Sequence, residues 1–167
     1  MPKFQPHDPD FRATTKRYVA AQPYLALLGA VLSSVEPGIA EYKLPYRESI
    51  GQQNGFFHGG VIGGIAEAVM GAAAATLVPA GANVVGAEYK VNLLSPGRGA
   101  ALLARGVVVK PGRRLIVCRA DVVALGEDGA EMLCAIAQGA MAVEPPAAAE
   151  KETPAEDRLS PLTHHHT

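Results

Sequence analysis

The residues best suited to chemistry lie between positions 51 and 77, where a glycine-rich loop runs into a long apolar segment. The loop contains His58, and Glu67 is the one formal charge between residues 59 and 87. A carboxylate in apolar surroundings is costly, because desolvation disfavours the charged form and raises the pKa. Carboxyl groups with raised pKa values are typical of functional sites. Glu67 is therefore the first candidate for chemistry in this chain.

A helix that the rest of the protein surrounds must position this carboxyl group. Residues 59–77 have the length of about five helical turns and are apolar on every side, which is typical of a fully wrapped helix. Pro79 and Gly81 predict the end of this helix.

Strand patterns lie on both sides of the helix. Apolar runs at 29–35 and 39–46, joined by a Pro-Gly turn, come before it. Runs at 85–93, 101–110, 115–125 and 131–143 follow it and are separated by turn residues. Because strands joined by short turns are antiparallel neighbours, we expect these four to form a meander. The sequence predicts an α+β fold in which an antiparallel sheet of about six strands wraps around one long helix.

The chain divides into three expected regions. Residues 1–28 form a lead-in with a short helix near 11–22, ended by Pro23, and residues 29–143 form the folded domain. Residues 144–167 are rich in Pro, Ala and charge and end in a run of histidines, which predicts a disordered tail.

Composition and charge argue against nucleic acid as a partner. With 167 residues, 49% of them hydrophobic, the chain suits one globular domain. A net charge of -1 and an aromatic content of 5% provide neither the basic surface nor the stacking platforms of nucleic-acid binders. Cys118 and Cys134 are not expected to pair, because Cys118 should lie opposite residue 138. The lack of an apolar N-terminal signal favours a reduced, cytoplasmic setting.

Together these features resemble the hotdog-fold acyl-CoA thioesterases of the phenylacetate-pathway and hydroxybenzoyl-CoA thioesterase type. The resemblance rests on Gln52 six residues before His58, on two glycines at the helix start, and on Glu67 nine residues after the histidine. A downstream VGAEYKVNLLSP strand extends it, so that it covers roughly residues 28–143. It implies a hotdog fold and hydrolysis of a small, aromatic or medium-chain acyl-CoA to the free acid and CoA. No metal and no further cofactor are expected, because coenzyme A is part of the substrate.

The resemblance also implies roles for particular residues. The N–H of Gly59 at the helix start would form an oxyanion hole, and the Gln52 amide would hold or polarise the thioester. Glu67 would act as a general base toward water or as a nucleophile toward the thioester carbon. His58 would orient the loop or contact the thioester.

Further residues are expected to bind the substrate. Lys110, Arg113 and Arg114 flank a turn that resembles the basic turn placed near the coenzyme A phosphates in the family. The remaining candidates for substrate contact lie in the loop and at the helix start; they are Asn54, Phe57 and Gly60, with Phe56, Val61 and Met70 as residues that could shape the acyl pocket.

Helix geometry predicts a shared active site. Glu67 lies eight residues beyond Gly59, roughly 12 Å along the helix axis, so it cannot readily reach a carbonyl held at its own helix start. Two antiparallel helices about a twofold axis would place each acid near the start of the other helix. We therefore expect a homodimer with shared active sites, and from the family a dimer of dimers.

One departure from the family bears on the mechanism. Relatives place a water-orienting hydroxyl one turn after the acid or on the following strand, where this chain has Gly71 and Gly86. The hydroxyl is missing here or comes from elsewhere, which leaves water attack and an anhydride intermediate both open.

Three alternatives remain open at this point. Glu67 could pair with a basic residue such as Arg105 or Arg119. Residues 59–77, with Gly-x-x-x-Gly spacings, could cross a membrane, although a mid-segment glutamate and amphipathic strands oppose this. A hotdog domain could also bind acyl thioesters without cleaving them, or hydrate or dehydrate the acyl chain.

Overall fold

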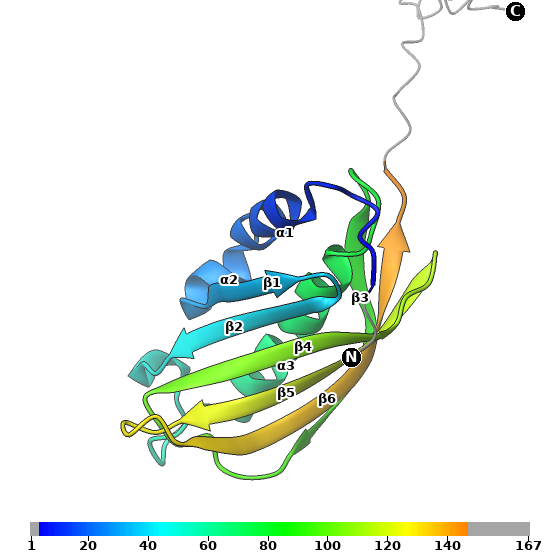
Figure 1. Cartoon of the computed structure of the whole chain (residues 1–167). Coiled ribbons are helices and arrows are strands. Elements are labelled where there is room, and N and C mark those ends of the chain that lie inside the picture. Colours follow the sequence, from blue (N-terminus) through cyan, green and yellow to red (C-terminus); the bar gives the residue numbers. More distant parts are fainter. Residues whose placement is uncertain (1–3, 147–167) are drawn as a thin grey trace, which may run out of the picture.

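A six-stranded antiparallel sheet curls around one long helix in the computed structural model of the protein, which describes residues 4–146 (Figure 1). The central helix is α3 (Gly59–Ala75). The strands are β1 (Val31–Glu36), β2 (Ile39–Pro45), β3 (Asn83–Leu93), β4 (Ala101–Lys110), β5 (Leu115–Leu125) and β6 (Glu131–Glu144). The expected α+β architecture is confirmed. Most of the predicted C-terminal tail lies outside the described residues.

Small residues let the sheet approach α3 closely. Alanines dominate its second half, and Ala72, Ala73 and Ala74 are fully buried. On β4, a Cβ atom added to Gly106 would lie 2.5 Å from the carbonyl oxygen of Val69, so the strand backbone packs directly on the helix backbone. The depth of α3 within the sheet is therefore set by backbone contact.

The strand order is β1-β2-β4-β5-β6-β3, and the expected four-strand meander is wrong for its first member. β3 pairs with β6 at the far edge of the sheet, and only β4, β5 and β6 form a meander. The turn residues Ser95-Pro96-Gly97 do not join neighbouring strands, as a meander requires, but belong to a longer crossing connection. Ser95 donates to the Leu133 carbonyl and Gly97 accepts from Phe57, so the connection follows the end of the sheet from β6 to β4.

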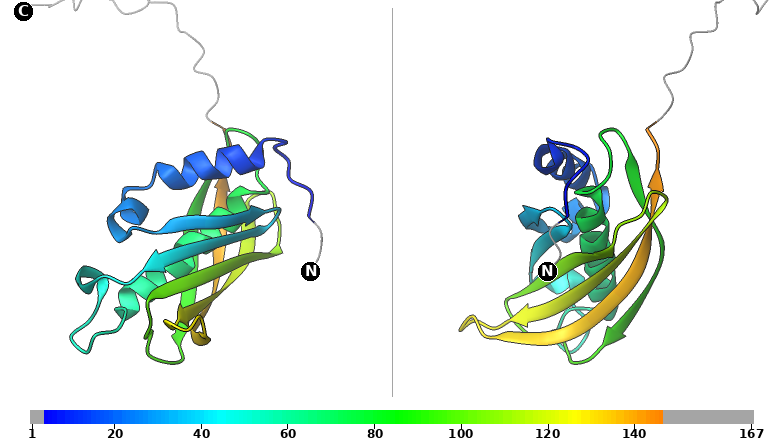
Figure 2. Two further views of the ribbon diagram at one scale, coloured as in Figure 1. Left: turned by 60° about the vertical axis from the view of Figure 1, so that its left-hand side comes forward. Right: turned by 45° about the vertical axis from the view of Figure 1, so that its right-hand side comes forward.

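Two helices at the N-terminus cover the side of α3 that the sheet leaves open (Figure 2). The expected short helix is α1 (Phe11–Ala20); Pro23 does not merely end it but begins a second helix, α2 (Pro23–Leu28). α1 reaches both sheet edges. Arg12 pairs with Glu36 on β1 at 2.6 Å, and the Tyr18 hydroxyl donates to the Val84 carbonyl on β3 at 3.1 Å.

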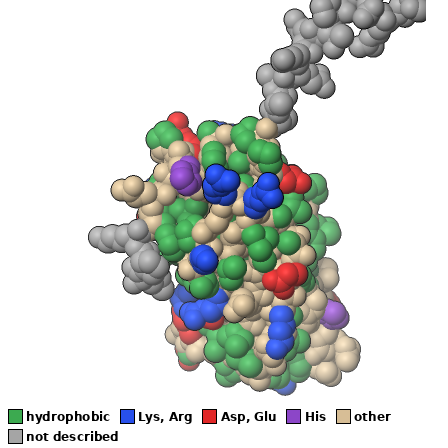
Figure 3. Space-filling view, turned by 90° about the vertical axis from the view of Figure 1, so that its right-hand side faces the viewer, with side chains coloured by type: hydrophobic (Ala, Val, Ile, Leu, Met, Phe, Trp, Pro, Cys, Tyr) green, Lys and Arg blue, Asp and Glu red, His purple; other side chains and the backbone are tan. Residues whose placement is uncertain are grey.

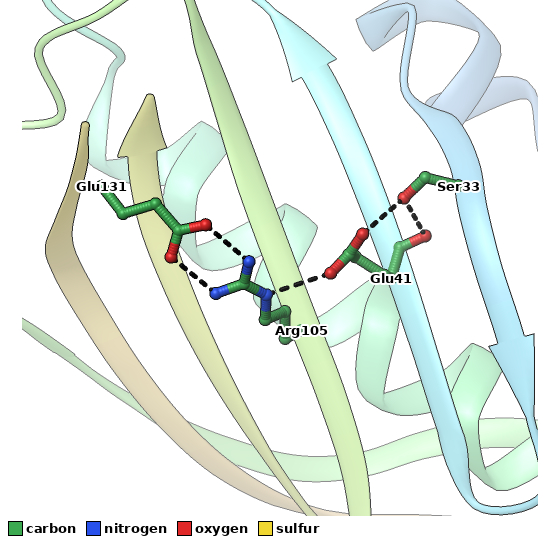
Figure 4. Close-up of polar contacts among 4 residues, drawn as sticks. All are labelled: Ser33, Glu41, Arg105 and Glu131. Atoms are coloured by element: carbon green, nitrogen blue, oxygen red, sulfur yellow. Dashed lines mark hydrogen bonds and ion pairs between the residues drawn. The ribbon is translucent and has the colours of Figure 1, made fainter. Parts of the chain in front are cut away.

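The outer face of the sheet carries an ion network (Figure 4). Arg105 donates to both carboxylate oxygens of Glu131, at 2.6 and 2.7 Å, and to Glu41 at 3.0 Å, while Ser33 donates to Glu41. By strand register, Arg105 and Glu131 lie on either side of Val123, which is 7% exposed although it faces outward. The bridge therefore shields an apolar residue on the outer face.

Charge is dispersed on one face of the molecule. On the face shown in Figure 3, Lys and Arg side chains lie among hydrophobic and acidic ones rather than in one basic patch. In the described part of the chain, no helix is long and apolar enough to cross a membrane. Cys118 lies opposite Gly139, one residue from the expected position, and both cysteines are buried free thiols.

Candidate active site

The carboxyl group of Glu67 lies in a pocket of about 600 Å³ between α3, β3 and α2. One wall is the α3 face that carries Gly60, Gly64 and Glu67, and the opposite wall is residues 86–89 of β3. Tyr24 of α2 closes the pocket from the side of the N-terminal helices. The pocket thus joins the sequence candidates Glu67 and Gly60 to a strand and a helix far away in the chain.

The backbone of β3 makes room for Glu67. A bulge interrupts the β3–β6 pairing between Gly86 and Glu88, and a Cβ atom on Gly86 would collide with the Glu67 carboxylate. Burial raises the pKa of Glu67, as the sequence predicted. Because Gly86 has no side chain, the Glu67 carboxyl group can lie against the backbone of β3.

The basic residues considered as partners of Glu67 are engaged elsewhere. Arg105 binds Glu41 and Glu131, and Arg119 lies 3.6 Å from Asp121. Both lie on the outer face of the sheet, away from α3. The ion-pair alternative for Glu67 is therefore wrong for these two residues.

His58 is the N-cap of α3. Its Nδ1 accepts a hydrogen bond from the N–H of Gly60 at 2.9 Å, and its carbonyl accepts from the N–H groups of Val61 and Ile62. Since Nδ1 is an acceptor, the ring proton is on Nε2. The N–H of Gly59 donates to neither the Nδ1 atom nor the carbonyl of His58, and it lies at the positive end of the helix dipole. That N–H is available to an oxygen that gains negative charge.

Gln52 lies in a tight loop just before His58. Its side-chain oxygen accepts from the N–H of Asn54 at 2.8 Å, and its backbone N–H donates to the Phe56 carbonyl. With the amide oxygen engaged, the NH₂ end is the part of Gln52 that can donate to a ligand. Phe57 is 2% exposed and packs edge-on against Tyr46, with ring centroids 5.1 Å apart, so it belongs to the core of this chain.

Gly59 and the loop candidates are separated from the acid within one chain, whereas Gly60 lines the pocket of Glu67. Gly59 lies more than two helical turns from Glu67, about 12 Å along the axis, and neither Gln52 nor His58 lines the pocket of Glu67. Asn54 is exposed on the loop, also away from the pocket of Glu67. Within one chain, the pocket of Glu67 therefore does not include Gln52, Asn54, His58 or Gly59.

The basic turn lies at the opposite end of α3 from Gly59. Arg113 and Arg114, on the turn between β4 and β5, line a second cavity of about 900 Å³ together with Leu77 and Pro79 beyond the helix C-terminus. Lys110 is an exposed residue at the start of the same turn. These three residues lie together, but not with Glu67 or Gly59.

Two tyrosines of the pocket were missed by sequence reasoning. Tyr89 faces α3 from β3, and the strand alternation that places Val91 inward also places Tyr89 inward, so a signal for it existed. Tyr24 lies in a segment for which no helix was predicted. Nothing in its local sequence connects it with Glu67.

A curled antiparallel sheet around a long buried helix is the hotdog fold, and in this protein the helix carries a desolvated carboxyl group. The model of the thioesterase superfamily matches residues 54–130. A thioesterase family protein from Silicibacter pomeroyi is 34% identical, with a TM-score of 0.78, over 80% of this chain and 98% of that one. The protein SSO1253 of Saccharolobus solfataricus is 30% identical over 80% of this chain and 81% of that protein. Its name describes it provisionally as an esterase.

The chain belongs to the thioesterase superfamily and has its hotdog fold. The structure of the E. coli PaaI protein, from the phenylacetic acid degradation operon, has a TM-score of 0.70 over 81% of this chain and 94% of that one. At 17% identity it shows the fold alone. The resemblance inferred from the loop and helix residues is confirmed.

Proposed function

We propose that the protein hydrolyses acyl-CoA thioesters, with a small, aromatic or medium-chain acyl group, to the free acid and CoA. This proposal rests on the environment of the Glu67 carboxyl group. The group is desolvated, lies in an open pocket and packs closely against Gly86. A carboxylate with a raised pKa is a stronger base than an ordinary glutamate.

In the proposed reaction Glu67 acts as a general base. It takes a proton from water as the water oxygen bonds to the thioester carbon, and the carbonyl oxygen becomes negative. The N–H of Gly59 and the NH₂ group of Gln52 donate to that oxygen. The C–S bond then breaks, and the departing thiolate takes the proton from Glu67. His58 holds the loop through its cap to Gly60.

The separation of Gly59 from Glu67 within one chain supports a site shared by two chains. Glu67 and Gly59 of one chain are about 12 Å apart, whereas antiparallel α3 helices would bring Glu67 of one chain to the Gly59 end of the other. β3 is an edge strand with Val85, Tyr89 and Leu93 at 44%, 45% and 56% exposure. An exposed apolar edge of this kind suits pairing with a second copy. A dimer of two such dimers is our proposal for the full assembly.

The same arrangement accounts for the position of the basic turn. Arg113 and Arg114 lie at the C-terminal end of α3, which antiparallel packing would bring toward the partner's helix start. There Lys110, Arg113 and Arg114 would meet the phosphates of coenzyme A. Asn54 and Gly60 remain candidates for contact with the rest of the substrate, whereas Phe57 is packed in the core.

The test is release of free CoA from a panel of acyl-CoAs, followed with a thiol reagent. Hydrolysis of at least one member is the expected result. Binding of acyl-CoA without thiol release would favour the non-hydrolytic alternative, and consumption of an enoyl-CoA without thiol release would favour a hydratase.

Glu67→Gln keeps the size of the side chain and removes its basicity. We expect kcat to fall by about a hundredfold or more with the fold retained, given the usual contribution of a general base. Glu127→Gln makes the same chemical change at an exposed turn and is the matched control. A folded Glu67→Gln variant with normal turnover would remove Glu67 from the mechanism. In a separate test, formation of a hydroxamate at Glu67 in the presence of hydroxylamine would show that the reaction passes through an anhydride rather than by direct attack of water.

A further inference from the structure

The hydroxyl group of Tyr24 rests against the backbone of α3 next to Glu67. A Cβ atom on Gly64 would collide with the Tyr24 hydroxyl oxygen and would lie 3.1 Å from the adjoining ring carbon. Gly64 and Glu67 are three residues apart and share one face of the helix, where Cβ positions are about 5–6 Å apart. The glycine thus admits a phenol one turn before the acid.

Tyr18 is the other N-terminal tyrosine that reaches this face, but its proton is engaged. Tyr18 approaches Gly71, one turn after Glu67, and donates to the Val84 carbonyl at 3.1 Å. Tyr24 instead lines the open pocket of Glu67 and is 45% exposed. Burial, with Tyr89 and Glu67 nearby, raises the pKa of Tyr24, so its hydroxyl is neutral at physiological pH.

This chain has no hydroxyl group at the two positions near Glu67 where relatives place one to orient the water, so Tyr24 is the group to consider for that role. Gly71 and Gly86 carry no side chain, and the hydroxyl of Thr76 is buried between the Ala73 carbonyl and the Gly38 N–H. Besides Tyr89 on the sheet side, Tyr24 is the hydroxyl that the described chain presents to the pocket of Glu67.

We propose that Tyr24 positions the hydrolytic water for Glu67. One O–H of the water donates to the Glu67 carboxylate and the other to the phenol oxygen of Tyr24, which leaves a lone pair free to attack the thioester carbon. This inference rests on the proposed thioesterase function. It gives the N-terminal helices a part in the site in addition to covering α3.

Tyr24→Phe keeps the ring and removes the hydroxyl. Loss of one hydrogen bond to the reacting water should lower kcat about tenfold, with KM and the melting temperature nearly unchanged. The matched control is Tyr18→Phe, which removes a hydroxyl from the same pair of helices but outside the pocket. It should lower the melting temperature, because the bond to Val84 is lost, and leave kcat unchanged.

A second variant tests the contact that places the phenol. The methyl group of Gly64→Ala would displace the Tyr24 hydroxyl, so this change should also lower kcat. Added to Tyr24→Phe, it should cost much less than it does alone, because the group it displaces is already absent. If Gly64 only packed against the Tyr24 ring, the effect of Gly64→Ala on kcat at constant KM would not depend on whether the Tyr24 hydroxyl is present.

The outcomes separate this inference from the function beneath it. If the protein releases CoA and Tyr24→Phe matches wild type in kcat, or if Tyr89→Phe alone carries the loss, Tyr24 does not position the water and the thioesterase assignment stands. Fully additive losses in Gly64→Ala and Tyr24→Phe would also overturn it. If no acyl-CoA is hydrolysed, the proposed function fails and this inference fails with it.

Discussion

Glu67 is a carboxyl group whose charged form the fold disfavours. Its pKa is raised by burial, and the carboxylate is packed against the backbone of Gly86 rather than against a basic side chain of the described chain. Such a group lowers stability whenever it is ionised, so its retention in the pocket is better explained by activity than by folding.

This cost predicts a pH-dependent gain in stability for Glu67→Gln. A raised folded-state pKa means that folding favours the protonated acid, so ionised Glu67 destabilises the protein above that pKa, and the penalty disappears below the ordinary value of 4.5. The variant should melt at a higher temperature than wild type at pH 7 to 8. The difference should vanish near pH 4, as measured by circular dichroism melts, with Glu127→Gln unchanged throughout. A variant that is less stable at neutral pH would contradict this account.

At the scale of residues, the sequence predicted what local pattern can carry. A lone charge among apolar residues identified Glu67, and a histidine before two glycines at a helix start identified the cap. Tyr24 could not be found in this way, because Tyr24 and Gly64 are 40 residues apart in the chain and lie on two helices that only the fold brings together.

At the scale of elements, α3 separates two sets of groups by its own length. Gly59 lies at one end, and the turn with Arg113 and Arg114 lies beyond the other. A rigid helix of 17 residues spans about 25 Å, so no loop movement in one chain brings these ends together.

Replacing Lys110, Arg113 and Arg114 by Ala tests what the basic end does. If the turn meets coenzyme A phosphates, KM should rise severalfold for CoA esters and stay near wild type for truncated thioesters that lack the nucleotide. Lys16→Ala, at an exposed position on α1, serves as the charge control. Equal effects on both substrates would exclude the turn from substrate binding.

The elements themselves were predicted better than their arrangement. Each strand has its own pattern, but alternation in 85–93 says nothing about which neighbour that strand takes. The connection after β3 contains Pro and Gly and looks like a hairpin turn, yet side-chain and backbone bonds tie it to β6 and to the loop at Phe57. Tertiary contacts of this kind leave no local signal.

At the scale of the whole molecule, the proposed shared site makes a quantitative prediction for mixed dimers. Gln52→Ala and Glu67→Ala chains would each form dimers impaired at both sites, whereas a dimer of one chain of each kind would have one intact site. With random mixing, half of the dimers are mixed and half of their sites are intact, so co-expression should restore about a quarter of wild-type activity.

The control is separate expression of each variant followed by mixing without subunit exchange, which should restore nothing. Verified mixed dimers that regain no activity, while each parent is severely impaired, would place the complete site within one chain.

The pairing of β3 with β6 also orders the events of folding. Asn83 of β3 and Glu144 of β6 are paired across 61 residues, and β6 is the last strand of the described chain. Pairing of strands so far apart in the sequence is slower than forming the β4–β5–β6 meander, whose strands are joined by short turns. Until β3 pairs with β6, Gly86 has no sheet to hold it against Glu67. In a chain emerging from the ribosome, α3 is synthesised long before β6, so the pocket of Glu67 acquires its sheet wall last, and any truncation before β6 removes the pocket while leaving every residue that lines it.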